Sequence, residues 1–138
     1  MLPALHPPEA SYRISIGLLA VRLVIGVAFM LHGWGKIQQP MSWMGPDATI
    51  PGILQACAAV AEFGGGALWI LGLLTPLASL GILVTMAVAM LTHIKRGDPF
   101  VGHGVSYEPA FAYLSVALLL LFAGPGRFSL DALQAKRR

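Results

Sequence analysis

The sequence has few charged residues, fewer than a soluble protein of this size needs. Charged residues make up 11% of the 138 residues, whereas hydrophobic residues make up 57%. Because soluble domains carry about 25% charged residues, this chain has too little polar surface to cover a globule in water. The shortage argues against an ordinary soluble enzyme or binding domain and predicts a protein whose solvent is lipid.

Cysteine is nearly absent as well. Cys57 is the single cysteine, so the sequence offers neither an internal disulfide nor a Cys-x-x-Cys redox pair. Its neighbours are alanines, and we expect a small buried core residue at this position. The basic residues lack the interleaved aromatic residues of a nucleic-acid-binding patch, despite a net charge of +3. A nucleic-acid partner is therefore not expected.

The sequence contains four long apolar runs. A helix needs about 20 apolar residues to cross a bilayer core of roughly 30 Å. None of the four runs carries the polar stripe of a helix in a soluble bundle. The runs are 14–31, which continues toward Lys36, then 53–74, 77–94 and 107–124. We therefore predict an all-α integral membrane protein, an antiparallel four-helix bundle with both termini on the same side.

The segments around these runs predict three parts of the chain. Residues 1–13 are a proline-containing N-terminal leader, 14–126 the transmembrane domain, and 127–138 a basic surface tail in which Ser129 caps a short helix. Pro76 suits the first turn of a helix, so the second and third runs are expected to form a tight hairpin. The first loop is expected to lie over the mouth of the bundle, and the third loop to be the polar one.

Basic residues are divided unequally between the two sides of the predicted bundle. The side of the termini carries Arg13, Arg127, Lys136, Arg137 and Arg138, and the opposite side carries Lys36, Lys95 and Arg96. Cytoplasmic loops carry the excess of Lys and Arg in membrane proteins, and a basic tail also suits anionic lipid. We predict a multi-pass protein of the cell inner (plasma) membrane with cytoplasmic termini.

Arg22 and Glu62 are the two charged residues inside the predicted spans. Ionisable side chains are costly in lipid, so they usually face the interior of a bundle and often mark a functional site. At about 1.5 Å of rise per residue, the two lie at nearly the same depth, and we expect them to pair. Helical spacing places Gly26, Phe29, Gly33 and Lys36 nearest the face of Arg22, a face of small residues with one aromatic. The sequence leaves open whether such a pair only fixes the helix register or takes part in chemistry.

A second group of polar residues is expected at the loop side of the bundle: His32, Lys36, His93, His103 and Glu108. Imidazole titrates near neutrality and a carboxylate can orient it, so such a group could relay protons to a quinone headgroup or bind a metal. His32, His93 and Glu108 are the candidate metal ligands, although no His-x-x-x-His spacing supports them. Met86, Met90 and His93 share a helical face and offer a copper alternative, although methionine usually serves packing.

Several motifs occur in an order that resembles the DoxX family of small four-helix membrane proteins, over residues 18–131. The first run carries Arg22-Leu-Val-Ile-Gly26, Phe29 and His32-Gly-Trp-Gly-Lys36. The second run carries Glu62-Phe-Gly-Gly65 and Leu71-Gly-Leu-Leu-Thr75, and the chain ends in Gly124-Pro-Gly-Arg-Phe-Ser-Leu-Asp131. Any one of these motifs would be weak alone, and their order carries the resemblance.

The resemblance implies a link to redox metabolism, because one branch of the family is a subunit of a thiosulfate:quinone oxidoreductase. The candidate cofactor-binding residues are Arg22, His32, Lys36 and Glu62, since a quinone carbonyl that gains electrons needs hydrogen-bond donors and protons. No catalytic residue is assigned. With one cysteine and no haem or flavin motif, electrons would come from a soluble or membrane redox partner protein. A membrane scaffold or small-solute conduit is the alternative, and a homo-oligomer stays open.

Overall fold

The computed structural model describes residues 10–136, and every regular element in this part of the chain is a helix. The predicted all-α class is therefore confirmed. The helices are α1 (Tyr12–Gln38), α2 (Gly52–Leu71), α3 (Thr75–Lys95), α4 (Glu108–Ala123) and the short α5 (Leu130–Ala135). Most of the predicted leader, residues 1–9, and the basic residues Arg137 and Arg138 lie outside the described residues.

Three of the described helices, α1, α2 and α3, are long and apolar enough to cross a membrane. Large apolar side chains are exposed along their outer faces, as expected for surfaces that meet lipid. Helix α4 is also apolar but has only 16 residues. At about 1.5 Å per residue it is roughly 24 Å long, which is shorter than a bilayer core of about 30 Å.

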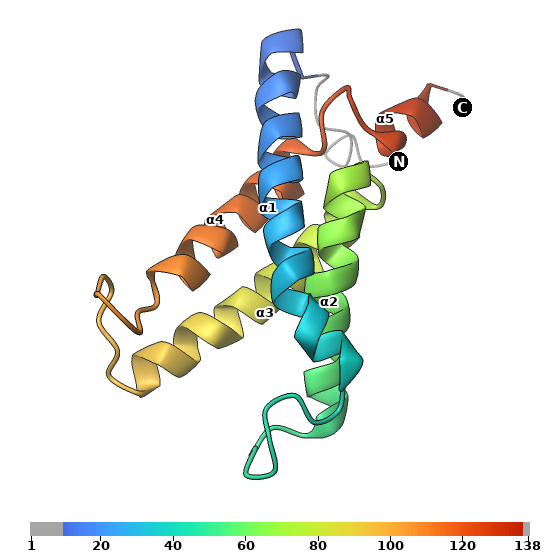
Figure 1. The fold of residues 1–138 in the computed structure, drawn as a ribbon. Helices are drawn as coiled ribbons and strands as arrows, with labels where there is room; N and C mark the ends of the chain where they lie inside the picture. The colour runs from blue at the N-terminus through green and yellow to red at the C-terminus, as the bar shows by residue number, and fades with distance from the viewer. Residues whose placement is uncertain (1–9, 137–138) are drawn as a thin grey trace.

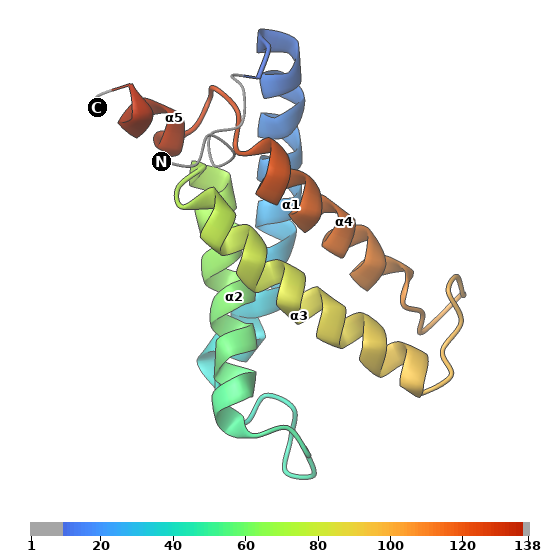
Figure 2. The ribbon, with the colours of Figure 1, turned by 180° about the vertical axis from the view of Figure 1, so that it is seen from behind.

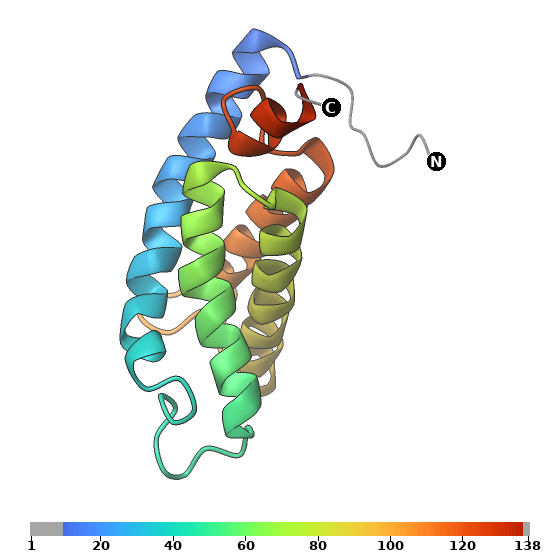
Figure 3. The ribbon, with the colours of Figure 1, turned by 90° about the vertical axis from the view of Figure 1, so that its right-hand side faces the viewer.

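The helices form two hairpins. Figure 1 shows α1 and α2 side by side, and α3 and α4 as a second pair that is inclined to the first. The view from behind in Figure 2 shows that the loop between α1 and α2 lies far from the loop between α3 and α4. The side view in Figure 3 shows α5 at the end of the molecule where α1 begins. The two helices of each hairpin thus stay together, while the loop of one hairpin lies far from the loop of the other.

Small residues allow α1 and α2 to pack closely. A Cβ atom at Gly66 would lie 2.6 Å from the carbonyl oxygen of Gly26, and one at Gly33 would lie 2.6 Å from the backbone nitrogen of Phe63. Neither distance leaves room for a side chain, so glycine is required for this contact. The buried face of α1 also holds Arg22 and Phe29, in agreement with the face predicted from helical spacing.

The core lies where the two hairpins meet. Trp69 is completely buried, and its indole nitrogen donates a hydrogen bond to the hydroxyl of Ser79, 3.0 Å away. The ring of Phe29 meets Trp69 edge-on and also contacts Tyr113. Cys57 lies outside this core and is exposed, so its predicted burial is wrong. Alanine neighbours in the sequence did not reveal which face of α2 turns outward.

The connections follow local sequence signals. Pro76 occupies the first turn of α3, as predicted, and Gly72 ends α2 with a left-handed backbone (φ +62°). The predicted cap of the last helix is also confirmed, because the Ser129 hydroxyl accepts a hydrogen bond from the backbone amide of Ala132 at 3.2 Å.

Candidate functional site

Arg22 is fully buried, with 1% of its surface exposed, but it does not pair with Glu62. Its guanidinium instead donates to four backbone carbonyls. These belong to Trp69 at 2.7 Å, Ile70 at 3.0 Å, Pro125 at 2.8 Å and Phe128 at 2.8 Å. The predicted Arg22–Glu62 pair is therefore wrong. The last carbonyls of a helix lack partners within it, and the negative end of the helix dipole attracts a cation.

The segment after α4 is tied to the same place. The Asp131 carboxylate accepts from the backbone amides of Leu74 and Thr75, at 2.8 and 2.9 Å, and so caps the start of α3. A Cβ atom on Gly72 would lie 2.5 Å from a guanidinium nitrogen of Arg22. We call the group of Arg22, Gly72 and Asp131 the terminal lock. It joins the α2–α3 turn to the end of the chain, and its role is structural.

Glu62 pairs with Lys36. The Lys36 ammonium donates to both carboxylate oxygens of Glu62, each at 2.7 Å. The Glu62 side chain is 3% exposed and that of Lys36 is 25% exposed, so the carboxylate is enclosed while the lysine side chain is partly accessible. The ammonium nitrogen also lies 4.5 Å from the centre of the Trp43 ring, close enough for a cation–π contact.

Gln55 holds the α1–α2 loop against this pair. The Trp43 indole nitrogen donates to the Gln55 carbonyl at 2.9 Å, and the Gln55 side chain accepts from the Met44 amide at 3.1 Å and donates to the Ile50 carbonyl at 2.9 Å. Because Gln55 is buried, these bonds fix the loop in one position. Sequence reasoning missed Gln55, although a glutamine early in an apolar run was a visible signal.

His32 lies one helical turn before Lys36, on an exposed part of α1. Its ring meets that of Tyr113 on α4, with 6.1 Å between the ring centres. Of the four residues predicted to bind a cofactor, the structure thus joins Lys36 and Glu62, places His32 beside α4, and puts Arg22 in the terminal lock. The single pocket predicted from all four residues does not form.

The predicted metal ligands are not brought together. Nδ1 of His93 lies 2.8 Å from a carboxylate oxygen of Asp98, and Glu108 is exposed at the start of α4. Within residues 10–136, no three His, Cys, Asp or Glu side chains are arranged to hold a metal ion, so His32, His93 and Glu108 form no such set. Met86, from the copper alternative, belongs to the apolar core.

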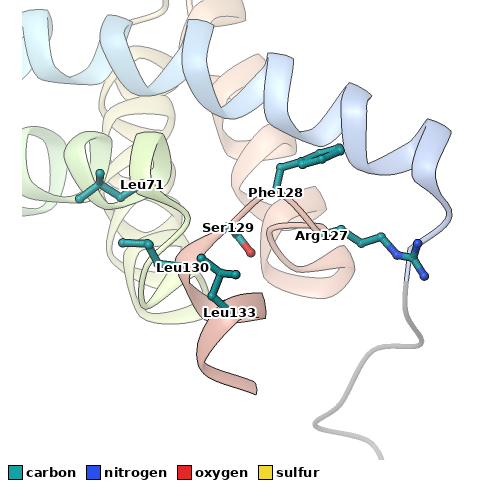
Figure 4. A pocket seen from close by; sticks show the side chains of 6 residues that line it. All are labelled: Leu71, Arg127, Phe128, Ser129, Leu130 and Leu133. Carbon is teal, nitrogen blue, oxygen red and sulfur yellow. The ribbon is translucent and has the colours of Figure 1, made fainter. Parts of the chain in front are cut away.

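A shallow cavity of about 350 Å³ lies at the C-terminal end of α2, beside Leu71 (Figure 4). Its lining is mostly apolar, and the Arg127 side chain in Figure 4 is directed away from the leucines. The lining residues are Leu71, Arg127, Phe128, Ser129, Leu130 and Leu133. The cavity therefore includes none of the residues predicted to bind a cofactor.

Comparison with known proteins places this arrangement in a family of membrane proteins. The chain is 32% identical to the inner membrane protein YqjF of Escherichia coli, over 88% of this chain and 95% of the relative. It is 30% identical to the uncharacterized membrane protein Rv3486 of Mycobacterium tuberculosis, over 87% and 82% of the two chains. The putative oxidoreductase CatD of Bacillus subtilis is 28% identical, over 84% and 85%.

No solved structure matches the chain. The family model for DoxX matches residues 17–94, which cover the three span-length helices, the Lys36–Glu62 pair and Arg22. The motif order found in the sequence points to the same family. This chain belongs to the DoxX family of integral membrane proteins.

Proposed function

We propose that this protein is the membrane module of a quinone-linked oxidoreductase, in which Lys36 and Glu62 receive the quinone headgroup. The observation that carries the proposal is the enclosed ion pair itself. A carboxylate side chain at 3% exposure holds the ammonium of a lysine whose side chain is 25% exposed. Charged groups are expensive at membrane depth, and a pair with one accessible side is typical of a site that exchanges protons or binds a polar ligand.

The chemistry of the pair suits a quinone carbonyl. Reduction of a quinone to a quinol consumes two electrons and two protons, and negative charge builds on the carbonyl oxygens as electrons arrive. An ammonium has three N–H donors, and the one that Glu62 does not engage can donate a hydrogen bond to such an oxygen, while Glu62 keeps the ammonium in place. His32, one turn earlier on α1, supplies an imidazole that can pass protons.

Electrons are proposed to come from a partner protein. The sequence has one cysteine and no haem or flavin motif, so it offers no redox group of its own. The name of the Bacillus relative, a putative oxidoreductase, supports a redox role, and the family resemblance supports the quinone. The chain would then bind the quinone in the membrane while the partner carries out the oxidation.

The proposal includes a fourth span and an orientation. Helix α4 is apolar and packs along α3, so we place it in the membrane as the last span of an antiparallel four-helix bundle. With four spans, both ends of the chain lie on one side, and the basic excess on that side favours the cytoplasm. The name of the Escherichia relative supports the inner membrane.

A scaffold is the second candidate, favoured by the terminal lock. The guanidinium of Arg22, the most buried charge in the described part of the chain, donates four hydrogen bonds to backbone carbonyls, which is a structural use of a charge. If Lys36 and Glu62 also have only a structural role, the protein holds partner proteins in the membrane and binds no quinone. The two candidates differ in whether a quinone binds at Lys36.

Quinone titration of purified protein in lipid nanodiscs separates the candidates. Quinones quench tryptophan emission, and Trp43 lies over the Lys36 ammonium. We expect saturable quenching by a short-chain ubiquinone or menaquinone analogue in wild type, and its loss in Lys36→Met. The matched control is Lys95→Met, because Lys95 is exposed and distant in sequence, and it should bind as wild type. Equal quenching of wild type and Lys36→Met would refute the quinone site and favour the scaffold.

A further inference from the structure

The loop between α3 and α4, residues 96–107, exposes apolar side chains beside the polar residues expected from its sequence, of which Arg96 and His103 are exposed. Val101 is 63% exposed and Val105 is 61% exposed, and Phe100 is also exposed. We call these three residues the apolar tip. In water, these three side chains would expose apolar surface to the solvent, because nothing in the described fold covers them.

The apolar tip belongs to an ordered loop. The ring of Phe100 packs against that of Tyr107, with 5.2 Å between the ring centres. Backbone amides of Tyr107 and Glu108 donate to the carbonyls of Pro99 and Phe100, at 3.2 and 3.1 Å, and close the loop across its base. The loop is therefore held in one shape that presents its apolar side chains outward.

The geometry of α4 explains why such a surface is needed. The helix is roughly 24 Å long, about 6 Å less than the bilayer core. Its hairpin is also inclined to α1 and α2 in Figures 1 and 2, and inclination shortens its reach across the bilayer further. A short, inclined span leaves its loop at the boundary of the hydrocarbon, where apolar and aromatic side chains are favourable.

Charged residues flank the tip as they would at a headgroup layer. Lys95, the last residue of α3, and Arg96, the first residue of the loop, are both exposed. Long basic side chains can extend from an apolar boundary to the lipid phosphates. Asp98, the acidic residue next to them, is engaged by His93. An apolar tip next to two basic residues matches a lipid interface. A binding site for a protein partner would not explain why α4 is short.

We infer that the apolar tip inserts into the lipid interface on the side opposite the termini and completes the fourth span that α4 begins. This inference rests on the proposed fourth span and is independent of the proposed quinone site. The lipid is the partner of this surface, with Lys95 and Arg96 at the level of its headgroups.

Spin labels measure the depth of the loop directly. Val101→Cys and Val105→Cys are made separately with Cys57→Ser, labelled, and placed in vesicles of phosphatidylethanolamine and phosphatidylglycerol. Collision with oxygen, which concentrates in lipid, is compared with collision with a nickel chelate, which stays in water. Reference labels are Leu119→Cys in the middle of α4 and Asp47→Cys in the other loop, both at exposed positions.

We expect the oxygen-to-nickel ratio of both tip labels to lie several-fold above that of Asp47→Cys and below that of Leu119→Cys. Tip labels as accessible to nickel as the Asp47→Cys label would overturn the inference, while a lipid-exposed Leu119→Cys label would leave the fourth span standing. A water-exposed Leu119→Cys label would overturn both. If the tip labels are accessible to the nickel chelate in vesicles but not in native membranes, a protein covers the tip and the lipid assignment is wrong.

Discussion

Replacing Arg22 with methionine should destabilise the protein strongly, because the guanidinium donates hydrogen bonds to four backbone carbonyls at once. Methionine keeps the length of the side chain and removes every donor. The carbonyls of Trp69 and Ile70 at the end of α2 and those of Pro125 and Phe128 after α4 would then lose these hydrogen bonds. The end of the chain would lose its main attachment to α2.

The magnitude follows from the number and burial of the bonds. A buried acceptor left without a partner costs about 1–3 kcal/mol. Three of the four bonds are only partly buried, so the lower end of that range applies to each. The fourth carbonyl, that of Trp69, keeps a hydrogen bond from the Gly72 amide at 3.1 Å, and the lost bond there costs about 1 kcal/mol. The sum is about 4 kcal/mol, within the range of about 3–5 kcal/mol for breaking a buried charged network. Arg22→Lys keeps the charge but loses the planar fork, and we expect about half of this loss.

Equilibrium unfolding by SDS in mixed micelles, followed by far-ultraviolet circular dichroism, measures this difference. Arg13→Met is the matched control, because Arg13 is an exposed arginine on the same helix. Its free energy of unfolding should stay within about 0.5 kcal/mol of wild type. The reasoning fails if Arg22→Met unfolds with the same free energy as Arg13→Met, since the four carbonyls would then gain nothing from the guanidinium.

Four other changes test the remaining assignments. A double-mutant cycle of Lys36→Met and Glu62→Gln in the same unfolding assay should give a coupling of about 1 kcal/mol or more, and additive effects would show that the ion pair does not stabilise the fold. Asp131→Ala should cost about 0.5–2 kcal/mol, because α3 loses its cap, and an unchanged stability would contradict that role. Gly33→Ala should destabilise the α1–α2 contact while Gly35→Ala, which has open space, should not; equal melting of the two variants would refute the close packing. A reporter active only in the cytoplasm, fused to the C-terminus, should be active in cells, and activity of a periplasmic reporter there would reverse the orientation.

The motifs that carry the family resemblance divide between two places in the structure. Arg22, the turn after α2 and the segment that ends at Asp131 meet in the terminal lock. The motif that ends at Lys36 and the motif that begins at Glu62 meet at the ion pair. A search for function therefore belongs at Lys36 and Glu62, and substitutions in the terminal lock will report on stability first.

The sequence by itself determined the membrane class, the helices and their ends. Apolar runs, the proline at position 76 and the serine at position 129 act over a few residues, so their effects are visible without the fold. The buried face of α1 followed from helical spacing in the same way. These features depend on local backbone chemistry and on the length of a bilayer.

Only the tertiary structure decided which charges meet. Counting residues from the assumed ends of two spans does not give the offset between the helices along their axes, so Arg22 and Glu62 looked like partners. In the structure Gly33 packs against Phe63 and Arg22 reaches Ile70, so Glu62 lies at the level of Lys36. The true partners of Arg22 are backbone carbonyls, which have no side-chain signature in a sequence. The angle between the two hairpins is likewise set by tertiary packing, mainly of α2 against α3.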